Sequence, residues 1–356
     1  MTPGPEQENL LPTIVALIES ARPFAVATVL QAEGSTPVPA GAKALVEADG
    51  AIHGTVGGGA VEAETRRRAK EAVRRRTPAV FGFDLRGPGP HDASPLCGGS
   101  MRLLVDPTAA ASLADYRRAA DALARRERGL WLTTLSYHNN VEVKSQFLSA
   151  AELGRHAGLP EAATLATSLA HEKAALVVGP GEGPCEVFIE PLIPRPVLLI
   201  VGGGHVGQAV AAQASLIGFE IVVIEDRPAF ADPRLFPPGT KTRCGVVAGE
   251  IAAFPTGPDT FIVIVTRGHQ QDVAALRACI RRPAAYLGMI GSRRKVPLVR
   301  RQFLEAGWAT AEEFERVHAP IGLDIGAVTV PEIAASIVAQ MIAVRRKGTA
   351  PGMPLT

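Results

Sequence analysis

VLLIVGGGHVGQAVAAQASLIGFEIVVIEDR, at Val197–Arg227, is the stretch of this chain that decides the fold. It contains in order an apolar run of strand length, a glycine-rich turn, small and apolar residues at helical spacing, a second apolar run and an acidic pair. The glycines follow the G-x-G-x-x-G spacing of a dinucleotide-binding turn. Strands continue to alternate with helices as far as residue 346. This order predicts a Rossmann-like, doubly wound parallel sheet.

The glycines of this turn suit a phosphate ligand. Gly202 permits the tight turn, Gly204 lets backbone N–H groups approach the anion, and Gly207 lets the helix lie close on the strand. The N-terminus of the helix adds unpaired donors and a partial positive charge. The motif therefore predicts a nucleotide or a related phosphate ligand. The alternative is a Rossmann-like scaffold that no longer binds one.

Polar side chains beside the turn extend this candidate site. Glu225 or Asp226 ends the second strand, where a carboxylate can accept hydrogen bonds from ribose hydroxyls. His205 lies inside the turn and either points at the ligand or faces solvent.

The composition describes a globular protein with ample core, since 47% of the 356 residues are hydrophobic and 20% are charged. A formal net charge of +2 is too small to indicate nucleic acid or an acidic membrane as a partner. Four widely spaced cysteines argue against a disulfide framework and a structural zinc site. No signal peptide is visible, and the uncharged residues 197–219 are too rich in glycine and glutamine for a membrane span. We therefore expect a cytoplasmic protein.

Prolines and local patterns divide the chain into domains. We expect an N-terminal α/β domain with a mixed sheet at residues 1–107, and a Rossmann-like domain at 196–346. Between them, residues 108–195 form a middle segment and a proline-rich linker, packed with the N-terminal domain, and residues 347–356 form a tail. Asp49-Gly50 predicts a hairpin, and Thr329 with Glu332 predicts a capped last helix.

Two more glycine turns lie in the N-terminal half. Gly57, Gly58 and Gly59 stand between a predicted strand and a predicted helix, so they form either a ligand loop or a tight turn alone. Cys97 precedes Gly98-Gly99, and its thiol is either a ligand for a soft metal or a small buried hydrophobe.

A basic cluster follows a predicted strand of the Rossmann-like domain, at Ser292, Arg293, Arg294 and Lys295. These side chains either clamp a phosphate or form a solvated helix start. Further candidates on the same edge of the sheet are His269, His318 and Asp324. No pattern indicates a general acid, a general base or a nucleophile, and we assign no catalytic residue and no metal ligand.

Several motifs together carry a resemblance to a known family. They include EGSTP at residues 33–37, GAK at 41–43, GTVGGGAVE at 54–62 and CGG at 97–99. In the second half they are GGGHVGQ at 202–208, DRP at 226–228, TRGHQQD at 266–272, GMIGSRRK at 288–295 and HAPIGLDIGA at 318–327. With these motifs the chain resembles the xanthine dehydrogenase accessory (XdhC/CoxI) family over nearly its full length.

The resemblance implies a molybdenum cofactor chaperone without turnover of its own. Such a protein binds molybdopterin, shields it while a sulfur donor of the cysteine desulfurase type acts on it, and passes it to a xanthine dehydrogenase-type molybdenum hydroxylase. A homodimer is also expected from the family. The residues that we assign to cofactor binding are Gly57, Gly58, Gly59, Cys97, Gly202, Gly204, His205, Gly207, Asp226, Arg227, His269, Ser292, Arg293, Arg294 and Lys295.

The sequence departs from the family at one position that bears on chemistry. Many relatives carry a cysteine after the triple glycine, where this chain has Ala60, so Cys97 is left as the motif cysteine. Two other functions stay open. The G-x-G-x-x-G turn and Asp226 also fit an oxidoreductase that binds NAD(P), or a nucleotide-binding regulatory subunit of a hydroxylase.

Overall fold

The computed structural model describes residues 10–85, 98–153, 160–179 and 184–347. They form two compact units, one up to Pro194 and one from Arg195 onward. Among the described helices, none has the length and apolar character needed to cross a bilayer.

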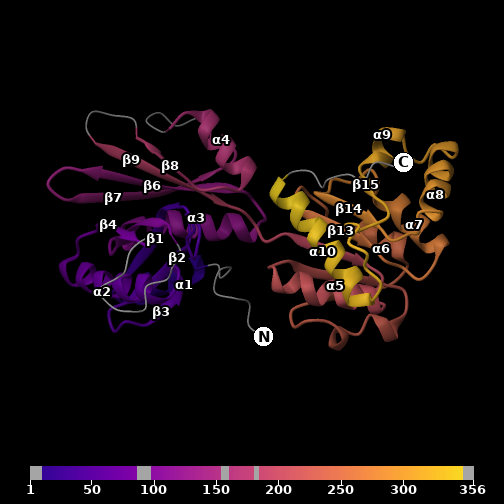
Figure 1. Cartoon of the computed structure of the whole chain (residues 1–356), viewed down its shortest axis with the longest axis horizontal. Helices are drawn as coiled ribbons and strands as arrows, with labels where there is room; N and C mark the ends of the chain where they lie inside the picture. Colours follow the sequence, from indigo (N-terminus) through magenta and orange to yellow (C-terminus); the bar gives the residue numbers. More distant parts are fainter. Residues whose placement is uncertain (1–9, 86–97, 154–159, 180–183, 348–356) are drawn as a thin grey trace. The chain divides into compact units, whose positions relative to one another are not determined.

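The first unit contains two antiparallel sheets (Figure 1). The five-stranded sheet has the order β3-β2-β1-β5-β4 and consists of β1 (Phe24–Glu33), β2 (Lys43–Glu47), β3 (Ile52–Gly54), β4 (Ala79–Asp84) and β5 (Ser100–Asp106). The four-stranded sheet has the order β7-β6-β9-β8 and consists of β6 (Gly129–Tyr137), β7 (Val141–Ser149), β8 (Ala175–Val178) and β9 (Cys185–Leu192). The helices are α1 (Leu11–Glu19), α2 (Gly59–Arg75), α3 (Leu113–Ala124) and α4 (Ala162–His171), and the 3₁₀ turn η2 (Ala109–Ser112) precedes α3.

Successive side chains along each strand point to opposite faces of its sheet, and they build the core of this unit in layers. One face of the five-stranded sheet packs against α2, through side chains such as Val29 and Val61. The other face, with Val26 and Leu45, packs against α1, α3 and the four-stranded sheet. The far face of the four-stranded sheet buries Leu132 against α4. Each sheet is therefore covered on both faces, which explains its long apolar strands.

The expected α/β class is confirmed, with one difference in the first sheet. We expected a mixed sheet, but its strand pairings are all antiparallel. The physical reason is the order in which the chain connects the strands. β2 and β3 form the hairpin at Asp49-Gly50 at one edge of the sheet, and after α2 the chain enters β4 at the opposite edge, beside β5. Helix α2 carries the chain across the sheet from β3 to β4, and because β2, β1 and β5 lie between these two strands, no two neighbouring strands are parallel.

The second unit is a six-stranded parallel sheet with the order β12-β11-β10-β13-β14-β15. Its strands are β10 (Val197–Val201), β11 (Glu220–Glu225), β12 (Lys241–Cys244), β13 (Thr260–Ile264), β14 (Tyr286–Met289) and β15 (Val317–His318). Its helices are α5 (His205–Leu216), α6 (Val247–Ala253), α7 (His269–Cys279), α8 (Lys295–Glu305), α9 (Ala311–Glu315) and α10 (Val330–Lys347), with the 3₁₀ turns η3 (Pro228–Phe230) and η4 (Pro233–Leu235). This is the strand order of dinucleotide-binding folds, and the predicted doubly wound parallel sheet is confirmed.

Helices cover both faces of this sheet (Figure 1). Leu199 and Val201 face α6, α7, α8 and α9, whereas Leu198 and Ile200 face α5 and α10. Because β10 is buried on both sides, its sequence is an unbroken apolar run. The strand order reverses between β10 and β13, so a crevice is expected where these two strands end.

Candidate functional site

The glycine turn after β10 is shaped by close backbone contacts. Gly202 has a φ of +117°, and a Cβ there would lie 2.5 Å from the carbonyl oxygen of Val265. A Cβ on Gly207 would lie 2.0 Å from the carbonyl oxygen of Gly202, so helix α5 can rest on the turn only if this residue is glycine. A Cβ on Gly204 would meet open space. A Cβ on Gly203 would lie 2.2 Å from the carbonyl oxygen of Phe230, so the turn needs three of its glycines for folding, and Gly204 leaves room for a ligand.

Backbone donors are available at this turn. The amide of Gly202 donates to Ile224, and the amide of Gly203 donates to Glu225. Within the described chain, no protein acceptor is found for the amides of Gly204, His205 and Val206, which begin α5. Such a group of unpaired amides, together with the helix dipole, suits an anion.

Glu225, at the end of β11, holds the turn in place. Its carboxylate is buried and accepts hydrogen bonds from the amides of Gly203, Asp226 and Arg227. The Arg227 guanidinium donates to the same carboxylate over 2.9 Å and lies 3.9 Å from the centre of the Phe230 ring. Burial alone raises the pKa of Glu225, but the hydrogen bonds from Arg227, Asp226 and Gly203 outweigh it and lower the pKa to about 2. Glu225 is thus an ionised structural carboxylate.

Asp226, the second acid, also borders the crevice. Its Oδ2 accepts a hydrogen bond of 2.8 Å from Gln271 and one of 3.2 Å from Arg267. The sequence left open which of the two acids meets a ligand. Because Glu225 is occupied by the turn, Asp226 is the one available.

The crevice is a pocket of about 260 Å³ at the carboxyl ends of β10, β11 and β13. It is lined by Gly202, Gly204, His205, Val206, Ile224, Glu225, Asp226, Arg227, Val247, Val265, Thr266, Arg267, Gln271, Ile290 and Val330. Unpaired amides and polar or charged side chains contribute part of this lining, and aliphatic side chains contribute the rest. The pocket can therefore receive a phosphate together with a flat, partly apolar group.

Five predicted site residues line this pocket, namely Gly202, Gly204, His205, Asp226 and Arg227. Gly207 supports it from beneath through its contact with Gly202. Sequence reasoning missed Gln271, Thr266 and Val247. Gln271 stands in the TRGHQQD motif one helical turn into α7, and this position on the binding edge is the signal that could have revealed it.

The basic cluster lies outside this lining. Lys295 forms an ion pair with Asp272, whose side chain is 1% exposed, and thereby joins two sequence motifs. Arg293 pairs with Asp324 over 2.8 Å at the surface. Ser292 accepts a hydrogen bond from the amide of Lys295. Two of the three cations are thus partnered by carboxylates, and a role of the cluster in ligand binding stays a prediction.

The predicted histidines also lie outside the pocket lining. His269 begins α7. His318 stacks on Tyr286 with ring centroids 4.7 Å apart, and burial lowers its pKa. Asp324, the third candidate on this edge of the sheet, is also absent from the lining, and stacking on Tyr286 holds the His318 imidazole against the core.

In the first unit, three motifs that are distant in sequence come together. A Cβ on Gly99 would lie 2.5 Å from the carbonyl oxygens of Glu33 and Ser35, and a Cβ on Gly57 would lie 2.6 Å from Pro37. Gly58 caps α2, with a φ of 70°. Gly57 of the triple glycine and Gly99 of the CGG motif thus both pack against the EGSTP segment.

Cys97 belongs to the last of these motifs but lies outside the described residues. Within the described ranges, no group of three or more histidine, cysteine or acidic side chains is arranged to hold a metal ion.

Comparison with known proteins agrees with this architecture. The model of the XdhC Rossmann domain matches residues 198–341, and that of the XdhC and CoxI family matches residues 17–84. An uncharacterized protein of Escherichia coli K12, YqeB, is 30% identical over 345 residues, which cover 97% of this chain and 47% of that protein. This chain thus spans about half the length of that relative. A protein of Bacillus subtilis described as a probable subunit of xanthine dehydrogenase is 25% identical over 342 residues, covering 93% of this chain and 96% of that protein.

A solved structure shares the fold. It is a protein of Bacillus halodurans described as a xanthine dehydrogenase, with a TM-score of 0.73, 23% identity, and coverage of 96% of this chain and 98% of that one. The two family models together match more than half of the sequence, one in each unit. The chain therefore belongs to the XdhC and CoxI family.

Proposed function

We propose that this protein binds the molybdenum cofactor (molybdopterin), protects it during sulfuration and assists its insertion into a xanthine dehydrogenase-type molybdenum hydroxylase. Membership of the family suggests a role in xanthine dehydrogenase maturation. The observation that carries the proposal is the pocket at the switch point of the parallel sheet, where the amides of Gly204, His205 and Val206 have no acceptor among the described residues.

The residues present fit the chemistry of this cofactor. Molybdopterin carries a phosphate, and the free amides at the start of α5 would hold it without a side chain, since a Cβ at Gly204 would point into open space. The aliphatic side chains of Val206, Val247 and Ile290 would flank the flat ring system. Once delivered to a hydroxylase, the cofactor supplies the metal centre of that enzyme. The part of this chain is to bind the cofactor and to exclude water from it.

A second function is favoured by one specific observation, the carboxylate of Asp226 in the pocket lining. An acid at this position can accept from ribose hydroxyls, so a nucleotide such as NAD(P) is the alternative ligand. The protein would then be an oxidoreductase or a regulatory subunit of a hydroxylase. A sulfur donor of the cysteine desulfurase type and a homodimer are further parts of the proposal.

The test is a direct binding experiment. The purified protein is incubated anaerobically with released molybdenum cofactor and desalted, and the bound pterin is measured by its fluorescent oxidation product. NAD and NADP are titrated against the same sample. Gly204→Val should lose the ligand, whereas Gly82→Val, a matched change at an exposed position of strand β4, should keep it.

Near-stoichiometric pterin that is lost in Gly204→Val would support the cofactor chaperone. Binding of NAD or NADP without pterin would overturn it in favour of the nucleotide ligand. Pterin retained in Gly204→Val would move the site away from the Rossmann-like pocket, and the triple glycine of the first unit would be tested next.

A further inference from the structure

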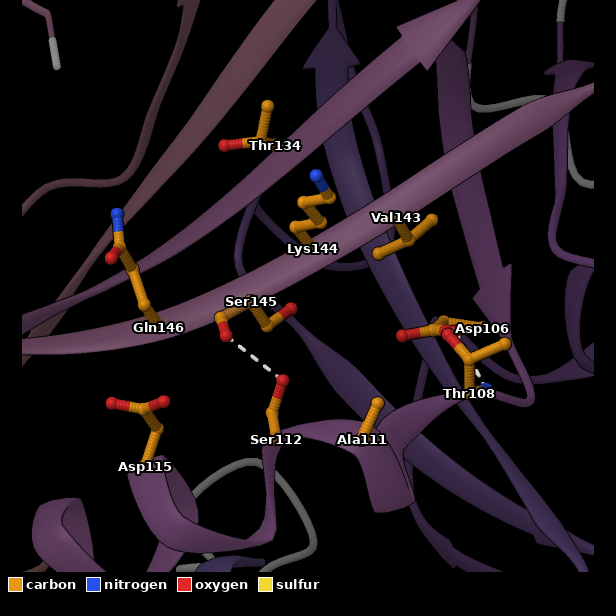
Figure 2. A pocket seen from close by; sticks show the side chains of 10 residues that line it. All are labelled: Asp106, Thr108, Ala111, Ser112, Asp115, Thr134, Val143, Lys144, Ser145 and Gln146. Atoms are coloured by element: carbon orange, nitrogen blue, oxygen red, sulfur yellow. Dashed lines mark hydrogen bonds between the residues drawn. The ribbon is translucent and has the colours of Figure 1, made fainter. Parts of the chain in front are cut away.

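A second cavity lies in the first unit and contains none of the residues predicted from sequence. Its volume is about 420 Å³. It is lined by Asp106, Thr108, Ala111, Ser112, Asp115, Thr134, Val143, Lys144, Ser145 and Gln146 (Figure 2). The cavity runs beside β7, which pairs with β6 alone and is therefore the edge of its sheet.

Side chains cover the second half of this edge. The amide of Phe147 donates to Asp115 over 3.2 Å, and its carbonyl accepts from Arg118. The carbonyl of Ser145 accepts a hydrogen bond of 2.8 Å from the Ser112 hydroxyl. The amide of Ser149 donates to Glu152. Such contacts satisfy an exposed edge and prevent another strand from pairing with it.

The first half of the same edge is open. In an antiparallel strand, alternate residues direct both backbone groups to the same side, so Val143 and Ser145 face outward like Phe147. The amide and carbonyl of Val143 and the amide of Ser145 have no partner among the described residues. Both residues line the cavity. The free groups therefore repeat along the strand with the spacing of a β-ladder, which an extended peptide can match.

The side of the cavity that faces this edge carries two carboxylates: Asp115 is paired with Arg118 over 3.0 Å, whereas Asp106 has no basic partner among the described residues. Asp106 is 5% exposed, and its Oδ1 accepts hydrogen bonds from the amide and hydroxyl of Thr108. Asp115 lies on the same side of β7, whereas Lys144 projects on the opposite side with Thr134, its partner in the ladder (Figure 2). Burial raises the pKa of Asp106 because it disfavours the charged carboxylate, and a cation bound beside it would act in the opposite direction and stabilise that charge. Charge complementarity thus favours a basic side chain.

We propose that the open part of β7 binds an extended, basic segment of a partner protein, which adds to the sheet as a short strand and directs a lysine or arginine toward Asp106. Backbone hydrogen bonds to Val143 and Ser145 would supply affinity, and the cavity beside them would select the side chain. The size of the cavity limits the added strand to a few residues.

The experiment uses the full chain and blocked, fluorescein-labelled pentapeptides of alternating valine. Their central residue is arginine, lysine, glutamine or glutamate. Fluorescence anisotropy should show binding of the arginine and lysine peptides at least about tenfold tighter than of the glutamate peptide, because only a cation complements Asp106. Hydrogen–deuterium exchange should show slower exchange across residues 141–147 when the arginine peptide is bound.

Two proline substitutions provide a matched pair. Val143→Pro removes an outward amide that makes no ladder bond, so an edge strand tolerates it, while addition of a peptide is blocked. Val141→Pro makes the same change outside the cavity lining, and both valines pack against the same core cluster. Binding should be lost in Val143→Pro and stay within about twofold in Val141→Pro. Asp106→Asn, which keeps the acceptor for Thr108, should remove the preference for basic peptides.

Three results would overturn the proposal. They are no binding of the basic peptides at millimolar concentration, equal affinity for basic and acidic peptides, and unchanged binding in a folded Val143→Pro variant. If Val143→Pro does not fold, the exchange pattern and Asp106→Asn decide the question. A basic peptide that protects a segment other than β7 also contradicts it.

Discussion

The backbone amide of Gly203 donates a hydrogen bond of 2.8 Å to the carboxylate of Glu225. This contact ties the glycine turn after β10 to the end of β11, so the acid of the second strand acts on the protein rather than on a ribose. Both acids line the pocket, and the neighbouring Asp226 is thereby left as the carboxylate that a ligand can use.

Substitution of Glu225 should therefore destabilise the turn. Glu225→Gln removes an ionised acceptor shared by Gly203, Asp226 and Arg227, and hydrogen bonds to a charged group are each worth about 1.5–3 kcal/mol. We expect a loss on the order of 2 kcal/mol in the free energy of unfolding at neutral pH, measured by urea denaturation.

The same substitution gives a pH test with a defined sign. The pKa of Glu225 is lowered by folding, from 4.5 to about 2, so its contribution to stability is complete above pH 4.5 and disappears as the pH falls through 2. The difference in stability between wild type and Glu225→Gln should shrink over that range. A difference that stays constant down to the lowest pH would show that the carboxylate does not titrate in this way.

The buried pair between Asp272 and Lys295 predicts a structural role for a lysine of the basic cluster. Lys295→Met leaves the carboxylate of Asp272 buried without its cation, which should cost about 3–5 kcal/mol of stability. The double variant with Asp272→Asn removes the unpaired charge and should recover much of the loss. Thermal unfolding of the three proteins measures both effects. A Lys295→Met protein as stable as wild type would leave the lysine free for a ligand.

The glycines of the turn should separate folding from binding. Gly207→Val places a Cβ 2.0 Å from the carbonyl oxygen of Gly202, so α5 must move and stability should fall by about 1–3 kcal/mol or more. Gly204 has a φ of −71° and open space at its Cβ position, so Gly204→Val should fold normally. That variant should lose at least about tenfold in affinity for a phosphate ligand, because the side chain covers the free amides. Melting curves and ligand titration together decide the outcome.

The exposed arginines of the basic cluster allow a test of whether this cluster binds an anionic ligand. Arg293→Ala with Arg294→Ala breaks only a surface ion pair with Asp324, so the melting temperature should change little. If the cluster meets the ligand, cofactor affinity should fall by about tenfold or more, since charge-assisted contacts are strong. Arg301→Ala, an exposed change on α8, the helix that follows the cluster, is the control, and it also breaks one surface ion pair, with Glu305. Affinity within twofold of wild type would make the cluster a solvated surface.

Much of the fold could be predicted from local patterns. The run from Val197 to Ile224 combines strand, turn and helix signals that agree with one another, and the hairpin at Asp49-Gly50 is set by its turn residues. Strand β7 and helix α4 had no such signals. β7 is an edge strand in which apolar and polar residues alternate over residues 141–144 but not beyond them, so its pairing depends on β6.

By itself, the sequence determined the parallel sheet of the second unit and the place of its pocket, because glycine spacing is a steric requirement of the backbone. Only the tertiary structure decided which charged groups are free. In the sequence, Glu225 and Lys295 are candidates for ligand binding. In the folded chain, Glu225 accepts a hydrogen bond from Gly203, and Lys295 forms an ion pair with Asp272. Only the tertiary structure revealed the cavity beside Val143. Whether the edge of a strand is unpaired depends on which other parts of the folded chain pack against it.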